Sequence, residues 1–413
     1  MPAEALHALG EVEGGHQSIA NLFNFMITSA YWPPDWNVLI LIALLKPGKQ
    51  PHLPSSYRPI HLQVVLAKLF CVVMDTELRR TLDLQSLLSQ QFGFRAERST
   101  RDCVFIIREL IRHFVRKKLS LYLTFYDFEK AFDKVVRHLL YGEMQFLGVH
   151  DKWVTMLRAM YTNVRACLST DSSRRLFSEA GGVKQGDGLS PLVFILFTHD
   201  LPSTMQETVQ THRAAALPRS PTVSPNDLLP PSHCALTYAD DLINIAISKS
   251  ECQAMSHALH PYCVARLLTV SVPKTLTMVI GTKQQRLAFD NSGGVTYNGM
   301  RIERTSSFKY LGTTLTDGSP GSNTAHTHIL SRARRAHFAA LSRSAKLGMA
   351  TPLSIHVKIY TMWVINNVLY GCESDILPQT HVRQLDDIQM RFARCLFRTH
   401  VNHPSPTTAP HSF

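Results

Sequence analysis

Two adjacent aspartates, Asp240 and Asp241, stand between two apolar runs, 235–238 and 242–247. Apolar, β-prone runs that meet at a short polar centre predict a β-hairpin, with the two carboxylates at its tip. Unshielded carboxylates this close together repel and raise each other's pKa. One interpretation is a solvated Asp-Asp turn, and the other is a site for magnesium, which prefers hard oxygen ligands. The apolar flanks favour the metal site, which needs a third carboxylate.

The third carboxylate is predicted at Asp127. The run 121–126 has the composition of a buried strand, and Asp127 follows its last residue. Beyond Asp127 the spacing of apolar residues predicts an amphipathic helix, whose apolar face is made by Phe128, Ala131, Phe132, Val135, Val136, Leu139 and Leu140. Sheets flanked by helices present ligand groups where a strand ends and a helix begins. Asp127 is therefore predicted to complete the metal site.

Upstream segments predict two strands and a helix. The run 36–50 indicates a buried strand that ends in a basic turn with Pro and Gly, and 57–60 indicates a second, short strand. Ser99 and Thr100 can cap a helix whose apolar residues recur at helical spacing as far as Phe114.

Three further segments differ from these regular patterns. The glycine-rich segment 181–197 suits a backbone that approaches a ligand or a strand closely. Residues 202–232 are rich in proline and predict a surface insertion just before the hairpin. The tail after His400 has the composition of a disordered segment.

The charge balance points to a polyanionic partner. The chain of 413 residues is long enough for two or three domain-sized units, and its formal net charge is +12. Such a balance is typical of nucleic-acid-binding proteins, although a plain basic enzyme is the alternative. The eight cysteines are scattered without a C-x-x-C pair, which fits a reducing compartment. The apolar run 38–45 is too short to span a bilayer. An intracellular protein without a membrane anchor is predicted, in the nucleus or the cytoplasm.

The basic charge is concentrated late in the chain. No acidic residue occurs from Gly318 to Cys372. A helix predicted there carries most of the basic residues of this stretch, namely Arg332, Arg334, Arg335, Arg343 and Lys346. A solvated basic helix is the ordinary interpretation, but the absence of acids favours a surface that tracks phosphates.

With these features in order, the chain resembles the reverse transcriptases of non-LTR (LINE-type) retrotransposons. The segments that carry the resemblance are KPGK (46–49), YRPI (57–60), QFGFRAERST (91–100), FYDFEKAFDKV (125–135), VKQGDGLSP (183–191), TYADDL (237–242), VSVPKT (270–275), FKYLG (308–312) and LYGCE (369–373). They follow the family's order and cover roughly residues 21–398, which is most of the chain.

The resemblance implies an α+β fold of the right-hand polymerase type. It implies fingers at 1–118, a palm with an antiparallel sheet at 119–285, a helical thumb at 286–400 and a tail at 401–413. The implied activity is RNA-directed DNA synthesis, with an RNA template, a DNA primer and dNTPs as partners. The implied cofactors are two Mg²⁺ ions, with Mn²⁺ as a substitute, held by Asp127, Asp240 and Asp241.

The resemblance also assigns substrate contacts. Lys46 and Arg58 match residues that grip the incoming triphosphate, and Lys274 matches a lysine near the leaving pyrophosphate. Gln185 and Gly186 match the loop behind the template nucleotide. Phe132 matches a bulky gate against the ribose 2′-hydroxyl, with a role in the apolar core as the alternative. For Lys46 and Lys274, simple solvation is the competing interpretation.

Some features depart from the family pattern. Val272 stands where many relatives have Asn, and Cys71 stands where Glu is common after Lys68. No endonuclease pattern precedes the first polymerase block, so the chain is expected to be an excised or truncated polymerase segment. The alternative function is a decayed element product that binds nucleic acid without catalysis. Oligomeric state is left open.

Overall fold

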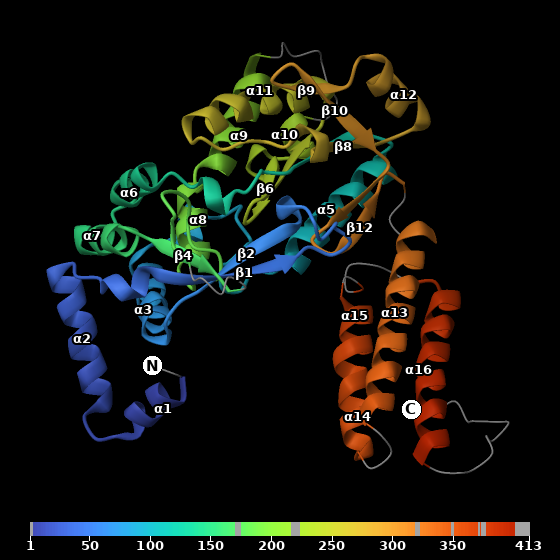
Figure 1. Ribbon diagram of the computed structural model, residues 1–413. Helices are drawn as coiled ribbons and strands as arrows, with labels where there is room; N and C mark the ends of the chain where they lie inside the picture. The colour runs from blue at the N-terminus through green and yellow to red at the C-terminus, as the bar shows by residue number, and fades with distance from the viewer. Residues whose placement is uncertain are drawn as a thin grey trace. The chain divides into compact units, whose positions relative to one another are not determined.

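The structure is a computed structural model that describes residues 3–169, 175–215, 224–318, 323–347, 351–370, 372 and 377–400. It is an α+β protein in which helices are combined with a six-stranded, a four-stranded and a two-stranded sheet (Figure 1). The tail predicted to be disordered, 401–413, lies outside the described residues. Within those residues, each helix is either too short or too polar to cross a membrane.

The chain divides into two compact units. Unit 1 comprises Met1–Arg98, Thr124–Leu276 and Val295–Glu303, and unit 2 comprises Ser99–Leu123, Thr277–Gly294 and Arg304–Phe413. The helices of unit 1 are α1 (Ala3–Glu11), α2 (Gly15–Ser29), α3 (Val65–Thr81), α4 (Leu84–Leu87), α6 (Arg137–Phe146), α7 (Asp151–Met160), α8 (Ser190–Phe197), α9 (Leu201–Ala215), α10 (Pro225–Leu228) and α11 (Lys249–Ala265). Short 3₁₀ turns η1 (Pro34–Asn37), η2 (Pro54–Ser56), η3 (Phe132–Lys134), η4 (Pro231–His233) and η5 (Val272–Lys274) connect them.

The four-stranded sheet lies in unit 1 and has the order β2-β1-β4-β5, with β1 (Val38–Leu45), β2 (Tyr57–Leu62), β4 (Arg165–Leu168) and β5 (Phe177–Ser178). The two predicted upstream strands are confirmed, but the prediction that the first is buried is wrong. Leu39 is fully buried, whereas Leu44 is 52% exposed. The reason is that β4 pairs only with 38–41, so the end of β1 forms a two-stranded ribbon with β2.

The six-stranded sheet carries the predicted hairpin. Its order is β6-β7-β3-β8-β10-β9, with β3 (Leu121–Tyr126), β6 (Ala235–Tyr238), β7 (Asp241–Ala246), β8 (Leu276–Ile280), β9 (Val295–Tyr297) and β10 (Met300–Thr305). Strands β6 and β7 pair antiparallel, which confirms the hairpin. In β7 every residue after Asp241 is buried, as expected for an interior strand of apolar composition.

A helix was predicted to begin directly after Asp127, and this predicted start is wrong. Residues 127–136 form turns and the 3₁₀ turn η3, and α6 begins only at Arg137. The backbone groups of this stretch bond to distant segments, because the carbonyl of Phe132 accepts from Val183 N at 2.9 Å and Glu129 N donates to the carbonyl of Thr269 at 2.9 Å. These tertiary bonds replace the local helical bonds that the apolar spacing predicts.

The segment 202–232 is largely not a surface insertion. Its first half belongs to α9, which packs against α11 and buries Met205 and Val209. Arg213 near the end of α9 donates two hydrogen bonds of 2.9 Å to the Glu251 carboxylate. That carboxylate is 2% exposed, so the ion pair fastens α9 to α11. Residues 216–223 lie outside the described residues.

Unit 2 contains α5 (Thr100–Lys117), α12 (Lys283–Asn291), α13 (Asn323–Leu347), α14 (Leu353–Tyr360), α15 (Asn366–Leu369) and α16 (Gln379–His400), with the π-helix η6 (Thr361–Ile365) and a sheet of β11 (Ser307–Tyr310) and β12 (Thr313–Thr316). Helix α5 confirms the predicted helix and starts with a capping box of Ser99 and Asp102. The basic stretch forms α13, which packs with α14, α15 and α16 around the buried residues Ala336, Ala340, Tyr360, Val364, Phe392 and Leu396 (Figure 1).

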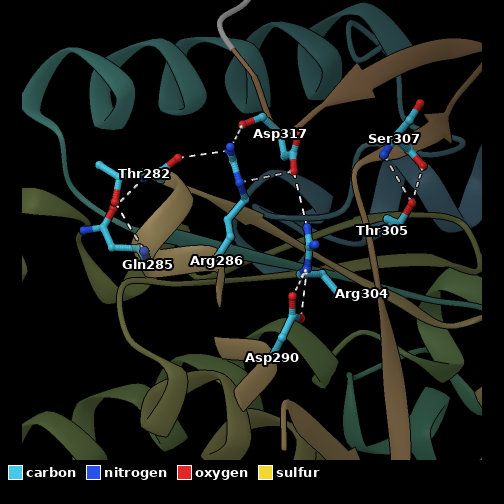
Figure 2. Close-up of polar contacts among 9 residues, drawn as sticks. Thr282, Gln285, Arg286, Asp290, Arg304, Thr305, Ser307 and Asp317 are labelled. Carbon is cyan, nitrogen blue, oxygen red and sulfur yellow. Dashed lines mark hydrogen bonds and ion pairs between the residues drawn. The ribbon is translucent and has the colours of Figure 1, made fainter. Parts of the chain in front are cut away.

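A chain of ion pairs joins α12 to the strands of unit 2 (Figure 2). Arg304 on β10 donates from Nε to both carboxylate oxygens of Asp290 on α12, at 3.0 and 3.1 Å. Arg304 also reaches Asp317 after β12 at 3.4 Å, and Arg286 on α12 lies 3.7 Å from the same carboxylate. The alternating charges are partly buried, so they fix α12 to β10 and to the end of β12.

Candidate active site

The hairpin tip is a two-residue turn. Tyr238 on β6 pairs with Asp241 on β7, which leaves Ala239 and Asp240 as the turn residues. Ala239 has φ 56°, in the left-handed region that residues other than glycine seldom adopt. The turn is of the kind that follows the twist of the strands. It places Asp240 at the tip and Asp241 as the first residue of β7.

A glutamine holds this strained turn in place. The Gln91 side-chain Oε1 accepts hydrogen bonds from Ala239 N at 2.9 Å and from Gly93 N at 2.8 Å. The backbone beside it pairs with β6, since Phe92 N donates to the carbonyl of Thr237 at 2.8 Å. A Cβ atom on Gly93 would lie 2.4 Å from Ala239 N, so this approach requires glycine. Gln91 and Gly93 belong to the QFGF motif, but sequence reasoning assigned them no role.

Asp127 follows β3 and is fastened through its backbone. Its carbonyl accepts from Ser271 N at 2.8 Å, and Phe128 forms an isolated bridge with Val270. Its carboxylate Oδ2 accepts a hydrogen bond of 2.9 Å from Lys274 Nζ. Asp127 and Lys274, predicted separately from two motifs, therefore lie in direct contact.

The three carboxylates act on one another electrostatically. Burial raises the pKa of Asp240, Asp127 raises it further, and Arg58 opposes the shift. Burial raises the pKa of Asp241 to about 6, with additional contributions from Asp240 and Asp127. Asp241 nevertheless keeps exposed surface at the start of β7. The end of β3 and the hairpin tip thus bring the three predicted aspartates within range of one another, as proposed from the sequence.

The donor set and its electrostatics fit a hard divalent cation. The carboxylate oxygens are ligands of the type that Mg²⁺ prefers. Burial, and after it the repulsion between the carboxylates, raises the pKa of Asp240 and Asp241, and a bound cation would offset both effects. Among the described residues, no group of three or more His, Cys, Asp or Glu side chains is closely enough gathered to enclose a metal ion. The ammonium of Lys274 supplies positive charge to Asp127 instead.

The predicted triphosphate contacts lie in different surroundings. Arg58 on β2 is exposed, and its charge lowers the pKa of Asp240, so it lies within electrostatic range of that carboxylate. Lys46 donates to the carbonyl of Ser55 at 3.1 Å, within the ribbon of β1 and β2. The electrostatic contact with the carboxylates is therefore shown for Arg58 and not for Lys46.

Phe132 lies in an aromatic group. Its ring stacks on Phe194 with centroids 4.6 Å apart and meets Phe94 edge-on at 6.5 Å. The side chain is only partly buried. One ring face therefore packs as a core residue does, while part of the side chain stays accessible.

The glycine-rich loop docks on β2. The carbonyl of Gln185 accepts from His61 N at 2.7 Å, and Gln185 Nε2 donates to Asp133 at 3.1 Å. Gly186 has φ 103°, and a Cβ there would lie 3.1 Å from the carbonyl of His61. The close approach to a strand predicted for this loop is confirmed. Lys184, to which the sequence analysis gave no role, is buried and donates to Asn37 and to the carbonyl of Met160.

The five basic residues predicted to bind nucleic acid differ in their contacts. Arg332 donates to the carbonyl of Tyr370 at 2.6 Å, and the Arg343 guanidinium lies 4.1 Å from the Trp363 ring centroid. Both are therefore engaged within unit 2. Arg334, Arg335 and Lys346 are exposed on α13, and Arg343 is exposed as well.

Comparisons with known proteins agree with the motifs. Residues 44–315 match the family model for reverse transcriptase (RNA-dependent DNA polymerase). The chain is 25% identical over 395 residues to the probable RNA-directed DNA polymerase from transposon BS of Drosophila melanogaster, covering 92% of this chain and 40% of that protein. It is also 25% identical over 388 residues to the RNA-directed DNA polymerase from mobile element jockey of Drosophila funebris, covering 90% and 39%. The chain thus spans about two fifths of the length of these relatives.

A solved structure of apo telomerase from Candida tropicalis aligns with 92% of this chain and 64% of that one, at 10% identity and a TM-score of 0.45. The family match and the mobile-element relatives confirm the predicted non-LTR retrotransposon type. The chain belongs to the reverse transcriptase (RNA-dependent DNA polymerase) family and has its α+β, right-hand polymerase fold.

Proposed function

We propose that this chain is an RNA-directed DNA polymerase that adds dNTPs to the 3′ end of a DNA primer on an RNA template. The observation that supports the proposal is the position of Asp127 at the end of β3 and of Asp240 and Asp241 at the hairpin tip, where the charge of Asp127 raises the pKa of both hairpin carboxyls. In a member of this family, three carboxylates at the end of β3 and the tip of the hairpin are suited to hold the metal ions of phosphoryl transfer.

Asp127, Asp240 and Asp241 would hold the two Mg²⁺ ions, or Mn²⁺ in their place. Such ions, when bound, activate the attacking 3′-hydroxyl and stabilise the charge that develops on the phosphates. Asp241, which is exposed at the start of β7, is the least direct ligand in this proposal.

Positively charged side chains would orient the triphosphate. Arg58 lies within electrostatic range of Asp240 and can form charge-assisted bonds to phosphate oxygens. Lys274 lies at Asp127, and its ammonium can donate hydrogen bonds to the leaving pyrophosphate. Lys46 is proposed to contact the triphosphate from farther out. Phe132 would border the sugar, and Gln185 and Gly186 would support the templating base.

The remaining regions would hold the template and primer. We assign fingers to 1–118, palm to 119–285 and thumb to 286–400, with Arg334, Arg335 and Lys346 as phosphate contacts. Arg332 and Arg343 support the thumb through their contacts with Tyr370 and Trp363. We place the reaction inside the cell, where RNA templates and dNTPs are available.

Primer extension on an RNA template tests the proposal. The wild-type protein should extend an annealed DNA primer with dNTPs and Mg²⁺, and Asp127→Asn should reduce the rate by at least 10³-fold while filter binding of the primer–template stays within a few-fold. If the wild-type protein binds the primer–template but does not extend it, the proposal is wrong and the binding-only alternative is correct.

A further inference from the structure

A groove runs along one side of unit 2, between α13 and α16. Its volume is about 460 Å³, within the range of roughly 300–1,000 Å³ typical of ligand pockets. The side chains that matter for its chemistry are Arg334, His337 and Phe338 from α13, and Asp387, Arg391 and Arg394 from α16. The groove lies outside the carboxylate site and was not singled out from the sequence.

The groove carries an excess of positive charge. Three guanidinium groups line it against the single carboxylate of Asp387. Arg334, Arg391 and Arg394 are exposed, and within the described ranges none of them forms an ion pair with an acid. Arg332 and Arg343 on the same helix α13, by contrast, contact Tyr370 and Trp363.

His337 does not add to this charge at neutral pH. It is 6% exposed, and burial together with Arg391 lowers its pKa. Its ring lies edge-on to Phe392, whose side chain belongs to the buried core of the helices. The charge of the groove therefore comes from the arginines and does not change with pH in the neutral range.

Phe338 is the aromatic side chain that the groove leaves accessible. It is 69% exposed, although its neighbours Ala336 and Ala340 on α13 are buried in the core. An exposed ring beside unpaired guanidinium groups is the combination by which proteins bind single strands, because bases stack on the ring and phosphates pair with the cations. A duplex keeps its base faces stacked inside, so it cannot use the ring in this way.

We propose that this groove binds an unpaired stretch of nucleic acid, with a base stacked on Phe338 and neighbouring phosphates paired with Arg334, Arg391 and Arg394. The arginines supply charge complementarity to phosphates of either form, and the accessible ring of Phe338 selects a single strand over a duplex. This inference goes beyond the proposed polymerase activity, since it requires no chemistry at the carboxylates.

Fluorescence anisotropy with the full chain tests the proposal. The probes are a fluorescein-labelled 16-nucleotide oligouridylate, an abasic strand of the same length and a blunt duplex. Phe338→Leu should weaken oligouridylate binding about tenfold, because base stacking contributes about 1–3 kcal/mol, and should leave the abasic strand unchanged. Arg391→Gln should weaken both single strands and lower the log–log salt slope by about 0.7.

Two control variants keep the test specific. Arg383→Gln changes an exposed arginine of α16 that does not line the groove, and Phe146→Leu changes a phenylalanine of α6 that is 82% exposed. Both should bind oligouridylate within twofold of the wild type. Thermal melts by circular dichroism verify that Phe338→Leu is as folded as these controls.

Three results would overturn the proposal: unchanged oligouridylate affinity in Phe338→Leu, an equal loss for the abasic strand, or a larger loss for the duplex. Primer extension by the same preparations separates this proposal from the polymerase proposal. If wild-type protein fails to extend a primer while the Phe338→Leu effect on oligouridylate is present, only the polymerase proposal fails.

Discussion

The geometry of single residues explains why the hairpin tip needs support. Ala239 adopts a left-handed conformation without the freedom of glycine, and two carboxylates follow it. Such a backbone conformation costs on the order of 1 kcal/mol or more and persists only where contacts with the surrounding structure stabilise it. Gln91 provides such contacts by accepting hydrogen bonds from the backbone amides of Ala239 and Gly93. Gln91 therefore positions Asp240 without contacting a substrate.

Gln91→Leu should slow nucleotide incorporation on an RNA template by about 100-fold, because misplacement of a catalytic group by about 1 Å has effects of this size. Two buried amides would also lose their acceptor, at about 1–3 kcal/mol each. The matched control is Gln90→Leu, since among the described residues the Gln90 side chain bonds only to the carbonyl of Ser232. Single-turnover incorporation with saturating primer–template is the measurement. Equal rates in the two variants would show that Gln91 has no positioning role.

When no divalent cation is present, ionisation of Asp241 lowers the free energy of unfolding by an amount that depends on pH. Its pKa is about 6 in the folded chain, against about 3.9 in an unfolded chain. Below pH 4 the group is protonated in both states, so it costs nothing. As pH rises from about 4 to 6 the unfolded chain releases this proton first, and folding stability falls by linkage.

In EDTA at pH 7, Asp241→Asn should therefore have a higher Tm than the wild type. The increase should be only on the order of 2 °C, because solvent screens the charge of an exposed carboxylate. The difference should vanish near pH 4. Melting curves by circular dichroism across this pH range check the prediction, with Asp151→Asn as a surface control. A lower Tm for Asp241→Asn at pH 7 would mean that its charge stabilises the fold.

At the scale of elements, the sequence pattern predicted correctly those helices and strands that are stabilised by interactions between residues close in sequence. The hairpin, the strand before Asp127 and the capped helix α5 follow from apolar periodicity and a capping box. The turns at 127–136 were not predictable, because backbone groups of Asp127, Glu129, Phe132 and Val135 bond to segments more than 40 residues away. Helix α9 was missed because the prolines that follow it dominate the composition of 202–232. The site aspartates were predictable from motifs, whereas Gln91 is revealed only by its hydrogen bonds.

The ion-pair chain of Figure 2 gives α12 a testable anchor. Arg304→Gln leaves Asp290 and Asp317 without their shared guanidinium, so we expect a loss of about 1 kcal/mol of stability, in the upper range for partly exposed pairs. Arg301→Gln, on the same strand but exposed, should change stability little. The stabilities of Arg304→Gln and Arg301→Gln are measured by thermal melts at low and at high salt. The absence of a difference at low salt would show that the chain of charges is energetically neutral.

At the scale of the whole molecule, each compact unit has its own chemistry. Unit 1 holds the three aspartates with Arg58, Lys274 and Gln91, so it contains the side chains proposed for phosphoryl transfer. Unit 2 holds the acid-free helix α13 and the arginine-lined groove. The carboxylate site and the surface proposed to bind phosphates therefore belong to different units.

The central claim is that Asp127, Asp240 and Asp241 together hold the divalent cations of a polymerase. Titration of Mn²⁺ followed by electron paramagnetic resonance, with primer–template present, tests it most directly. The wild-type protein and Asp151→Asn should bind Mn²⁺ with equal stoichiometry, and Asp240→Asn should lose at least one ion and its nucleotide incorporation together. Full Mn²⁺ stoichiometry in Asp240→Asn, with incorporation at the wild-type rate, would contradict the account.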